Sequence, residues 1–183
     1  MASPIFFYDL GSPYAWLAAE RIDDLFPVRP EWVPVLLGGI FRATGRASWG
    51  VGPDRPGGMA EVEERARRRG LPAVCWPDPW PNDGLHAMRV AAGADSRAFA
   101  LAAFRAHFTR GLALSDPASV DRVVAECGIA AQPAKDRLRE NTDRALSAGV
   151  FGVPPVVAGG QVFWGDDRLE DAVAASAPEQ QLE

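Results

Sequence analysis

The amino-acid sequence predicts a single α/β domain in which strands from both ends of the chain form one sheet, with a block of helices inserted between them. Short apolar runs rich in β-forming residues lie near the two ends, at 5–8 and 31–37 and again at 155–158 and 161–164. Neither end has enough strands for a stable sheet of its own, so the two ends are expected to pair with each other. The length of 183 residues also fits one sizeable domain better than two.

The first unit is predicted to be strand, helix, strand. The apolar run at 5–8 is bounded by a proline and a turn, and it indicates a buried strand. The Ser-Pro pair at 12–13 begins a helix, since a serine hydroxyl caps well and proline suits the first helical position. Apolar residues then recur at helical spacing over 14–26. In the second strand, at 31–37, Pro34 indicates an irregularity or an exposed edge.

The middle of the chain is predicted to be helical after a long irregular connection. Residues 38–58 are rich in glycine and proline, and they indicate a short helix followed by a loop. A helix is predicted over 59–69, and the prolines and tryptophans of 75–82 indicate an extended connection. Four more helices are expected from their start signals and closing glycines, at 83–94, 96–110, 116–127 and 133–148.

The last part of the chain returns to β structure. Two short strands at 155–158 and 161–164 flank a Gly-Gly pair, which is a hairpin signal, and a closing helix follows at 168–176. The resulting order, β-α-β, helices, β-β-α, predicts a thioredoxin-like fold with an inserted all-helical subdomain. The expected boundaries are one domain over 1–183, with the thioredoxin-like part at 1–45 and 149–177 and the helical insertion at roughly 58–148.

Charge and composition argue against several classes of partner. The formal net charge of -5 argues against nucleic acid, because phosphate binding needs a basic face. The arginines at 65–69 have glutamates beside them at 61–64, and they predict a solvated helix face rather than an anion site. No apolar run approaches the ~20 residues that span a bilayer, and the N-terminus carries no signal pattern. We therefore expect no membrane partner and a cytoplasmic location.

Cysteine and histidine usage argues against disulfide exchange and against a metal site. Cys75 and Cys127 lie far apart, outside any CxxC and away from the start of the first helix, so reduced thiols are expected. His86 and His107 lie on different predicted helices, and neither has a cluster of cysteines or carboxylates nearby in sequence. We expect no bound metal.

The first segment with chemical potential is the strand-to-helix turn that contains Ser12. Backbone N–H groups at a helix start favour negative charge, so a thiolate placed beside Ser12 would be stabilised there. A hydroxyl donating to that sulfur would lower the pKa of the thiol further. The alternative is that Ser12 serves only as a helix cap, as in many Ser-Pro pairs.

Two later segments complete the candidate site. In a thioredoxin-like fold the proline before the third strand, here Pro154, is cis and faces the start of the first helix, which frees the backbone of Val153 to pair with an extended peptide. The alternative is an ordinary proline at the start of a strand. Asp166 and Asp167 begin the last helix, where they either cap it or bind the amino group of a small peptide.

Taken in this order and spacing, the segments resemble the 2-hydroxychromene-2-carboxylate isomerases and the kappa-class glutathione transferases, which are branches of the DsbA-like thioredoxin superfamily. The resemblance extends over nearly the whole chain. The motifs that carry it are Phe-Tyr-Asp-x-x-Ser-Pro-Tyr-Ala at 7–15, Leu-Leu-Gly-Gly-Ile-Phe at 36–41, Pro-Asn at 81–82 with Ala-Met-Arg at 87–89, Leu-Arg-Glu-Asn-Thr at 138–142, Gly-Val-Phe-Gly-Val-Pro at 149–154 and Phe-Trp-Gly-x-Asp-Arg-Leu at 163–169.

The resemblance implies a site for glutathione. Ser12, the one residue assigned a catalytic role, would hold the sulfur of the cofactor. The cofactor-binding residues implied alongside it are Arg46, Arg55, Val153, Pro154, Asp166 and Asp167. The substrate-binding residues implied are Tyr14, Phe41, Trp49, Trp80 and Asn82, although at least half of the aromatic candidates in this region, which include Trp76, are expected to be core residues.

The activity that the resemblance implies is glutathione-dependent isomerisation of a small aromatic acid. The alternatives are a kappa-class-like transferase, which conjugates the thiol, and a thiol- or peptide-binding protein without catalysis. The family usually carries an asparagine and a lysine at the positions of Arg46 and Arg55, so the cofactor is glutathione or another low-molecular-weight thiol. Family members are commonly homodimers, and a homodimer is expected here.

Overall fold

The sheet brings the two ends of the chain together. The computed structural model describes residues 3–94 and 97–176, and its sheet has the strand order β2-β1-β3-β4. Strand β1 (Ile5–Tyr8) lies between β2 (Glu31–Pro34), to which it is parallel, and β3 (Pro155–Ala158), to which it is antiparallel. Strand β4 (Gln161–Trp164) pairs with β3 as a hairpin. The predicted α/β thioredoxin-like class is thereby confirmed.

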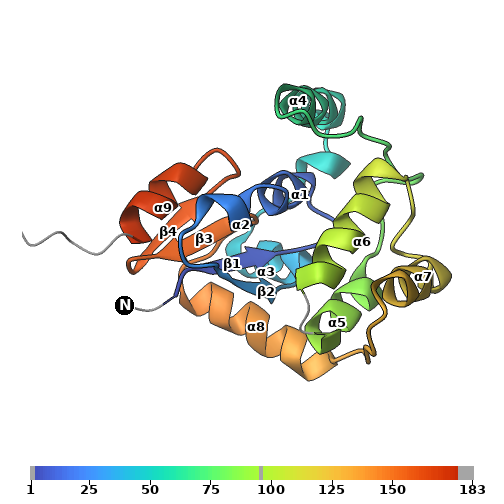
Figure 1. Ribbon diagram of the computed structural model, residues 1–183. Coiled ribbons are helices and arrows are strands. Elements are labelled where there is room, and N and C mark those ends of the chain that lie inside the picture. Colours follow the sequence, from blue (N-terminus) through green and yellow to red (C-terminus); the bar gives the residue numbers. More distant parts are fainter. Residues whose placement is uncertain (1–2, 95–96, 177–183) are drawn as a thin grey trace, which may run out of the picture.

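Helices cover both faces of this sheet and extend from one end of it (Figure 1). α1, α2 and α9 lie on one side and α8 on the other, while α5, α6 and α7 form the helical block and α4 lies outermost. The helices are α1 (Pro13–Ala19), α2 (Ile22–Leu25), α3 (Leu37–Thr44), α4 (Arg55–Arg68), α5 (Leu85–Ala94), α6 (Arg97–Thr109), α7 (Pro117–Cys127), α8 (Lys135–Ser147) and α9 (Leu169–Ser176), with a 3₁₀ helix η1 (Trp49–Val51) before α4.

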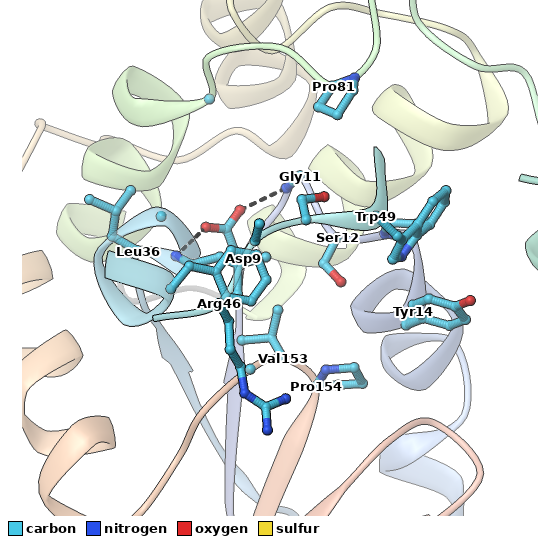
Figure 2. Close-up of a pocket in the computed structure, with 18 of the residues that line it drawn as sticks. Asp9, Gly11, Ser12, Tyr14, Leu36, Arg46, Trp49, Pro81, Val153 and Pro154 are labelled. Atoms are coloured by element: carbon cyan, nitrogen blue, oxygen red, sulfur yellow. Dashed lines mark hydrogen bonds between the residues drawn. The ribbon is translucent and has the colours of Figure 1, made fainter. Parts of the chain in front are cut away.

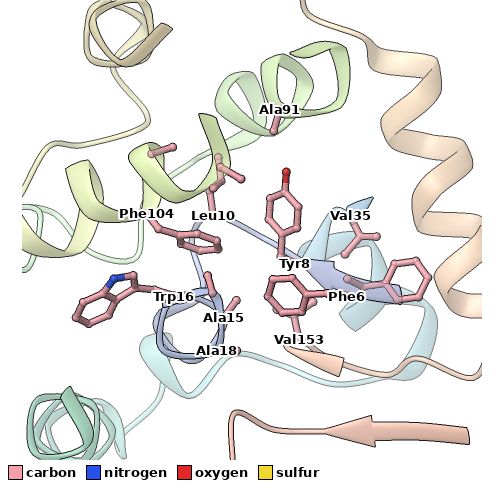
Figure 3. Packing of buried hydrophobic residues seen from close by; sticks show 14 of the residues in the cluster. Phe6, Tyr8, Leu10, Ala15, Trp16, Ala18, Val35, Ala91, Phe104 and Val153 are labelled. Atoms are coloured by element: carbon pink, nitrogen blue, oxygen red, sulfur yellow. The ribbon is translucent and has the colours of Figure 1, made fainter. Parts of the chain in front are cut away.

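One hydrophobic core runs from the sheet into the helical block (Figure 3). Phe6 and Tyr8 of β1 are buried, and the ring of Tyr8 lies 5.8 Å from that of Phe104 in α6. Trp16 of α1 stacks on Phe108, which is also in α6, with ring centres 5.7 Å apart. Because side chains of β1 and α1 pack directly against α6, the inserted helices help to fix the start of α1, where Ser12 lies.

The predicted helix over 14–26 is wrong in one respect, since it is broken between α1 and α2. Arg21 leaves the helical conformation at φ -127°, and its guanidinium forms an ion pair with Glu170 of α9. Glu20 beside it accepts hydrogen bonds from Arg105 and from the indole of Trp16. The break between α1 and α2 therefore coincides with contacts that the side chains of Glu20 and Arg21 make with α6 and α9.

Two other boundaries differ from the sequence prediction by more than two residues. The second strand ends at Pro34 rather than at residue 37, because α3 begins at Leu37. The strand is at the edge of the sheet, as its proline indicated. Helix α4 begins at Arg55, so Gly58 is helical rather than part of a loop. A Cβ at Gly58 would lie 2.4 Å from the ring of Trp49, and a glycine is required for that ring to pack on α4.

Within residues 3–94 and 97–176, no helix is both long enough and apolar enough to cross a membrane. The same residues contain no group of three or more histidine, cysteine or acidic side chains that could hold a metal ion.

Candidate functional site

A cavity of about 790 Å³ opens between the start of α1, helix α3, the segment before β3 and the loop that leads to α9. Its volume suits a small organic ligand. The structure brings all but one of the predicted site residues to its wall: Ser12, Tyr14, Phe41, Arg46, Trp49, Trp80, Asn82, Val153, Pro154, Asp166 and Asp167. Figure 2 labels Ser12, Tyr14, Arg46, Trp49, Val153 and Pro154 among them.

Ser12 is both a helix cap and part of the cavity wall. It is 5% exposed, and its Oγ accepts a hydrogen bond from the N–H of Ala15 at 3.2 Å. A hydroxyl can accept and donate at once, so this bond leaves the proton of Ser12 free for a ligand. The N–H of Tyr14 has no hydrogen-bond partner among the described residues, and it is a second donor at the same helix start.

The peptide bond between Val153 and Pro154 is cis, as predicted, and the two residues lie in the cavity wall below Ser12 in the view of Figure 2. The C=O of Pro154 accepts a hydrogen bond from Gly165 at 2.8 Å. The N–H and C=O of Val153 have no such partner in the described part of the chain. An extended peptide ligand is able to pair with them.

The two aspartates that precede α9 have different surroundings. Asp166 is 1% exposed, and its carboxylate is paired with Arg65 at 2.5 Å and also with Arg69, both from α4. Asp167 is exposed, and its carboxylate interacts with the guanidinium of Arg65 through longer-range electrostatic attraction. Asp166 thus holds α4 to the body of the protein, and the exposed carboxylate of Asp167 is accessible to a cation.

The arginine cluster of α4 is therefore only partly the solvated face that the sequence predicted. Arg67 and Arg68 do pair with Glu64 on the surface. Arg65 and Arg69 instead turn inward to the buried Asp166, because the loop before α9 packs against this face of the helix.

Tyr14 is tied into the same network. Its hydroxyl donates a hydrogen bond to Glu61 at 2.9 Å, and the guanidinium of Arg65 lies 5.3 Å from the centre of its ring. Burial and the neighbouring Glu61 carboxylate raise the pKa of Tyr14 above its ordinary value of 10.0. Tyr14 is therefore protonated at neutral pH, and it contributes a ring rather than a base.

Arg46 and Arg55 also have different surroundings. Arg46 lines the cavity, its guanidinium lies 4.4 Å from the ring centre of Phe151, and it forms no ion pair with any described carboxylate. Arg55 does not line the cavity, since its Nε and Nη2 donate to the C=O of Trp80 at 3.2 and 2.7 Å. Arg46 is thus the arginine available to an anionic ligand, and Arg55 supports the wall.

The aromatic wall consists of Tyr14, Trp49 and Trp80, with ring centres 6.0 Å apart for the first two and 5.1 Å for the last two. Asn82 continues this wall, and its side-chain N–H₂ donates to the C=O of Pro79 at 3.0 Å. Trp76 packs on Trp80 at 4.6 Å but does not line the cavity, so it has a supporting position.

Sequence reasoning missed several residues of the cavity, among them Asp9, Phe151 and Trp164. Asp9 was seen only as part of a turn, yet it is 8% exposed and lies in the wall. Phe151 and Trp164 pack together at 5.2 Å and line the cavity, and Trp164 is 47% exposed. The available signal for Phe151 and Trp164 was their place in the motifs that contain Val153 and Asp167. Their residue type gave no signal for a site, because aromatic residues near short strands usually indicate core.

Comparisons with known proteins agree with this fold. Human glutathione S-transferase kappa 1 is 26% identical over 198 residues, covering 90% of this chain and 86% of the human protein. A 2-hydroxychromene-2-carboxylate isomerase from Pseudomonas putida is 26% identical over 185 residues, covering 90% of this chain and 89% of the relative.

Solved structures show the same arrangement. A 2-hydroxychromene-2-carboxylate isomerase superposes with a TM-score of 0.77 at 22% identity, over 95% of this chain and 94% of that one. A probable DsbA oxidoreductase from Streptomyces coelicolor gives 0.75 at 18% identity, over 99% and 94%. The family model of the DSBA-like thioredoxin domain matches residues 5–176. The chain therefore belongs to the DSBA-like thioredoxin domain family.

Proposed function

We propose that this protein is a glutathione-dependent isomerase of a small aromatic acid, similar to 2-hydroxychromene-2-carboxylate isomerase. The observation that carries the proposal is that one cavity is lined by a serine hydroxyl with a free proton, a backbone segment without hydrogen-bond partners and an aromatic wall. The relatives that bear this activity in their names cover about the whole chain.

The residues fit a peptide thiol. The Ser12 hydroxyl would donate a hydrogen bond to the sulfur and hold it as a thiolate, because its acceptor side is already used by Ala15. Val153 would pair with the cysteinyl backbone of the ligand. When bound, glutathione would supply a thiolate that adds reversibly to a conjugated double bond of the substrate. The double bond becomes a single bond that can rotate, and loss of the thiolate restores it.

The charged ends of glutathione would be bound by two exposed charged residues, Arg46 and Asp167. Arg46 would bind a carboxylate, since its guanidinium is exposed to the cavity and unpaired within the described chain. Asp167 would bind the amino group of the γ-glutamyl end. The sequence assigned that role to both aspartates, but Asp166 is already neutralised by Arg65 and Arg69 and would act indirectly.

The aromatic wall would hold the ring of the substrate. Tyr14, Trp49 and Trp80 present apolar surface opposite the thiol-binding residues, which excludes water and orients a flat molecule. The role of the chain in the reaction is to keep the sulfur ionised and the conjugated system beside it.

The test begins with calorimetric titration of the purified protein with glutathione and with S-methyl glutathione. Binding of glutathione, weakened by the methyl group, supports a thiolate at Ser12. Turnover of 2-hydroxychromene-2-carboxylate is then followed with glutathione assayed at the end. Isomerisation with glutathione unconsumed supports the proposal, and binding of neither thiol contradicts it.

The second candidate is a transferase that conjugates the thiol to an electrophile, which the similarity to the human kappa-class protein supports. The same assay separates the two, because a transferase consumes glutathione in step with its substrate. A thiol- or peptide-binding protein without catalysis would bind glutathione and leave both classes of substrate unchanged.

A further inference from the structure

We propose that Asp9 is a positioning residue of this cavity, whose carboxylate joins the turn before Ser12 to the first turn of α3. The proposal rests on the proposed function only where it names the sulfur of the ligand. In that case Asp9 sets the distance between the sulfur-binding serine and the α3 wall that carries Phe41.

The two carboxylate oxygens of Asp9 bind two different segments. Oδ1 accepts a hydrogen bond from the N–H of Gly11 at 2.9 Å, and Oδ2 accepts one from the N–H of Leu37 at 2.8 Å (Figure 2). The backbone C=O of Asp9 accepts a third, from the N–H of Ser12 at 3.0 Å. One side chain therefore closes the Ser12 turn and binds a helix that is 28 positions further along the chain.

Helix α3 depends on this contact because it has no cap of its own. Its N-cap residue is Leu36, whose side chain makes no capping hydrogen bond. The N–H of Leu36 donates to Thr142 at 3.0 Å and that of Leu37 donates to Asp9, so residues from elsewhere in the chain satisfy both donors. The start of α3 is thereby fixed relative to Ser12.

A residue that only closed a turn would not need to be a carboxylate. Asparagine or serine at this place could accept the Gly11 N–H, but neither offers a second acceptor oxygen to Leu37. Burial raises the pKa of Asp9 while the two N–H groups lower it, so ionising this group inside the wall opposes folding. The two hydrogen bonds to Gly11 and Leu37 offset part of that cost.

The first experiment needs no ligand. Asp9→Asn keeps the shape but points a donor at one of the two N–H groups, and Leu37→Pro removes the N–H of Leu37 together with a side chain that lines the cavity. Leu37→Ala shortens that side chain and keeps the N–H, so it is the control for the loss of the side chain. Proline suits the first helical position, and Leu36 already has the extended conformation that a residue before proline requires. In amide NMR spectra Leu37→Pro should shift the signals of Gly11 and Ser12. Asp116→Asn, at the cap of α7, is the matched control and should leave them unchanged.

The second experiment measures the preference for glutathione over S-methyl glutathione as a ratio of dissociation constants. Asp9→Asn and Leu37→Pro should each reduce that ratio by about fivefold, the effect of one misplaced hydrogen bond, and the double variant should add nothing further. A residue that only stabilised the fold would lower the melting temperature and leave the ratio unchanged.

The outcomes separate the two proposals. If the wild type binds no thiol but Leu37→Pro shifts the Ser12 amide, the proposed function fails and the positioning role stands. If Leu37→Pro leaves the Gly11 and Ser12 amides unchanged, the positioning role is wrong, whatever the protein binds. A thiol preference in Asp9→Asn equal to that in Asp116→Asn also overturns it.

Discussion

Ser12 has a structural role as a helix cap, and in the proposed function the same side chain would also have a chemical role. Its oxygen accepts the N–H of Ala15, and the same hydroxyl retains a proton that faces the cavity. Both interpretations of the Ser-Pro pair are therefore compatible, because capping uses the lone pairs and ligand binding uses the proton.

Replacing Ser12 with alanine should remove both roles to different extents. We expect Ser12→Ala to cost about 1 kcal/mol of folding free energy through the lost cap, and to lower kcat/KM with the bound thiol by roughly a hundredfold. Thermal unfolding and steady-state kinetics measure the two effects. Ser119→Ala, in the first turn of α7, is the control. Unchanged kcat/KM in Ser12→Ala would leave this residue as a cap only.

At Arg46 the charge is unpaired within the described chain and is held over the ring of Phe151 at 4.4 Å. We expect Arg46→Ala to weaken glutathione binding by about tenfold, and to reduce the dependence of binding on salt, because one charge contact is lost. Titrations at low and high ionic strength measure both. Arg42→Ala, on the exposed side of α3, should change neither. Equal binding by the two variants would assign the carboxylate to another residue.

Among the elements, α4 is attached to the rest of the protein by both polar and apolar contacts. Arg65 and Arg69 bind the buried Asp166, and Tyr14 binds Glu61. The apolar contacts are the packing of Trp49 on the helix at Gly58 and the burial of Val62 and Ala66 in the core. The buried Asp166 carboxylate is thus the polar part of an attachment that also has an apolar part.

Neutralising that carboxylate should loosen α4 more than it destabilises the core. We expect Asp166→Asn to cost about 2 kcal/mol, since it leaves two partly buried arginines without their counter-charge. Hydrogen exchange of the α4 amides should accelerate, with that of β1 less affected. Asp171→Asn removes an exposed pair with Arg168 and should cost little. Equal exchange in the two variants would show that other contacts hold α4.

The sequence was most informative where local pattern decides the structure. Strands 5–8, 155–158 and 161–164 have the predicted bounds, because each is a short apolar run between turn residues. The start of α4 was missed because Gly58 is read locally as a loop residue, while its role is to admit the ring of Trp49.

The site was predictable as a set of motifs but not as a set of contacts. The thioredoxin-like fold and the family resemblance indicated that Ser12, Val153 and the two aspartates Asp166 and Asp167 meet, but local sequence had limits. It could not distinguish Arg65 from Arg67, or Arg46 from Arg55, since the partner of each guanidinium is chosen by segments far away in sequence. Asp9 was missed for the same reason, because its second partner, Leu37, belongs to another element.

For the whole molecule, the core includes one titratable group whose protonation opposes folding. His107 in α6 is almost fully buried, with its Nδ1 2.8 Å from the C=O of Leu112, and burial lowers its pKa from 6.5 to about 4. An unfolded chain binds a proton at this residue below about pH 6.5, whereas the folded chain does so only near pH 4.

Stability should therefore decrease as the pH falls from about 6.5 to about 4, by roughly 3 kcal/mol from this residue. Urea unfolding at several pH values in this range measures the loss. His107→Gln retains a donor for the Leu112 carbonyl and cannot take up the proton, so its stability should vary less with pH. A variant with the same pH dependence as the wild type would assign the effect to other groups.

Two strands that pair in the sheet, β1 and β3, are synthesised far apart in time. Ile5 of β1 pairs with Val157 of β3, so the central strand leaves the ribosome long before its neighbour exists. Until then, the apolar Ile-Phe-Phe-Tyr segment has an unpaired edge, and the cavity lacks its Val153 wall. A chain that stops short of β3 is expected to aggregate rather than to bind a thiol, because an open apolar strand edge is a template for other chains. The position of the last strands thus makes binding a property of the completed chain.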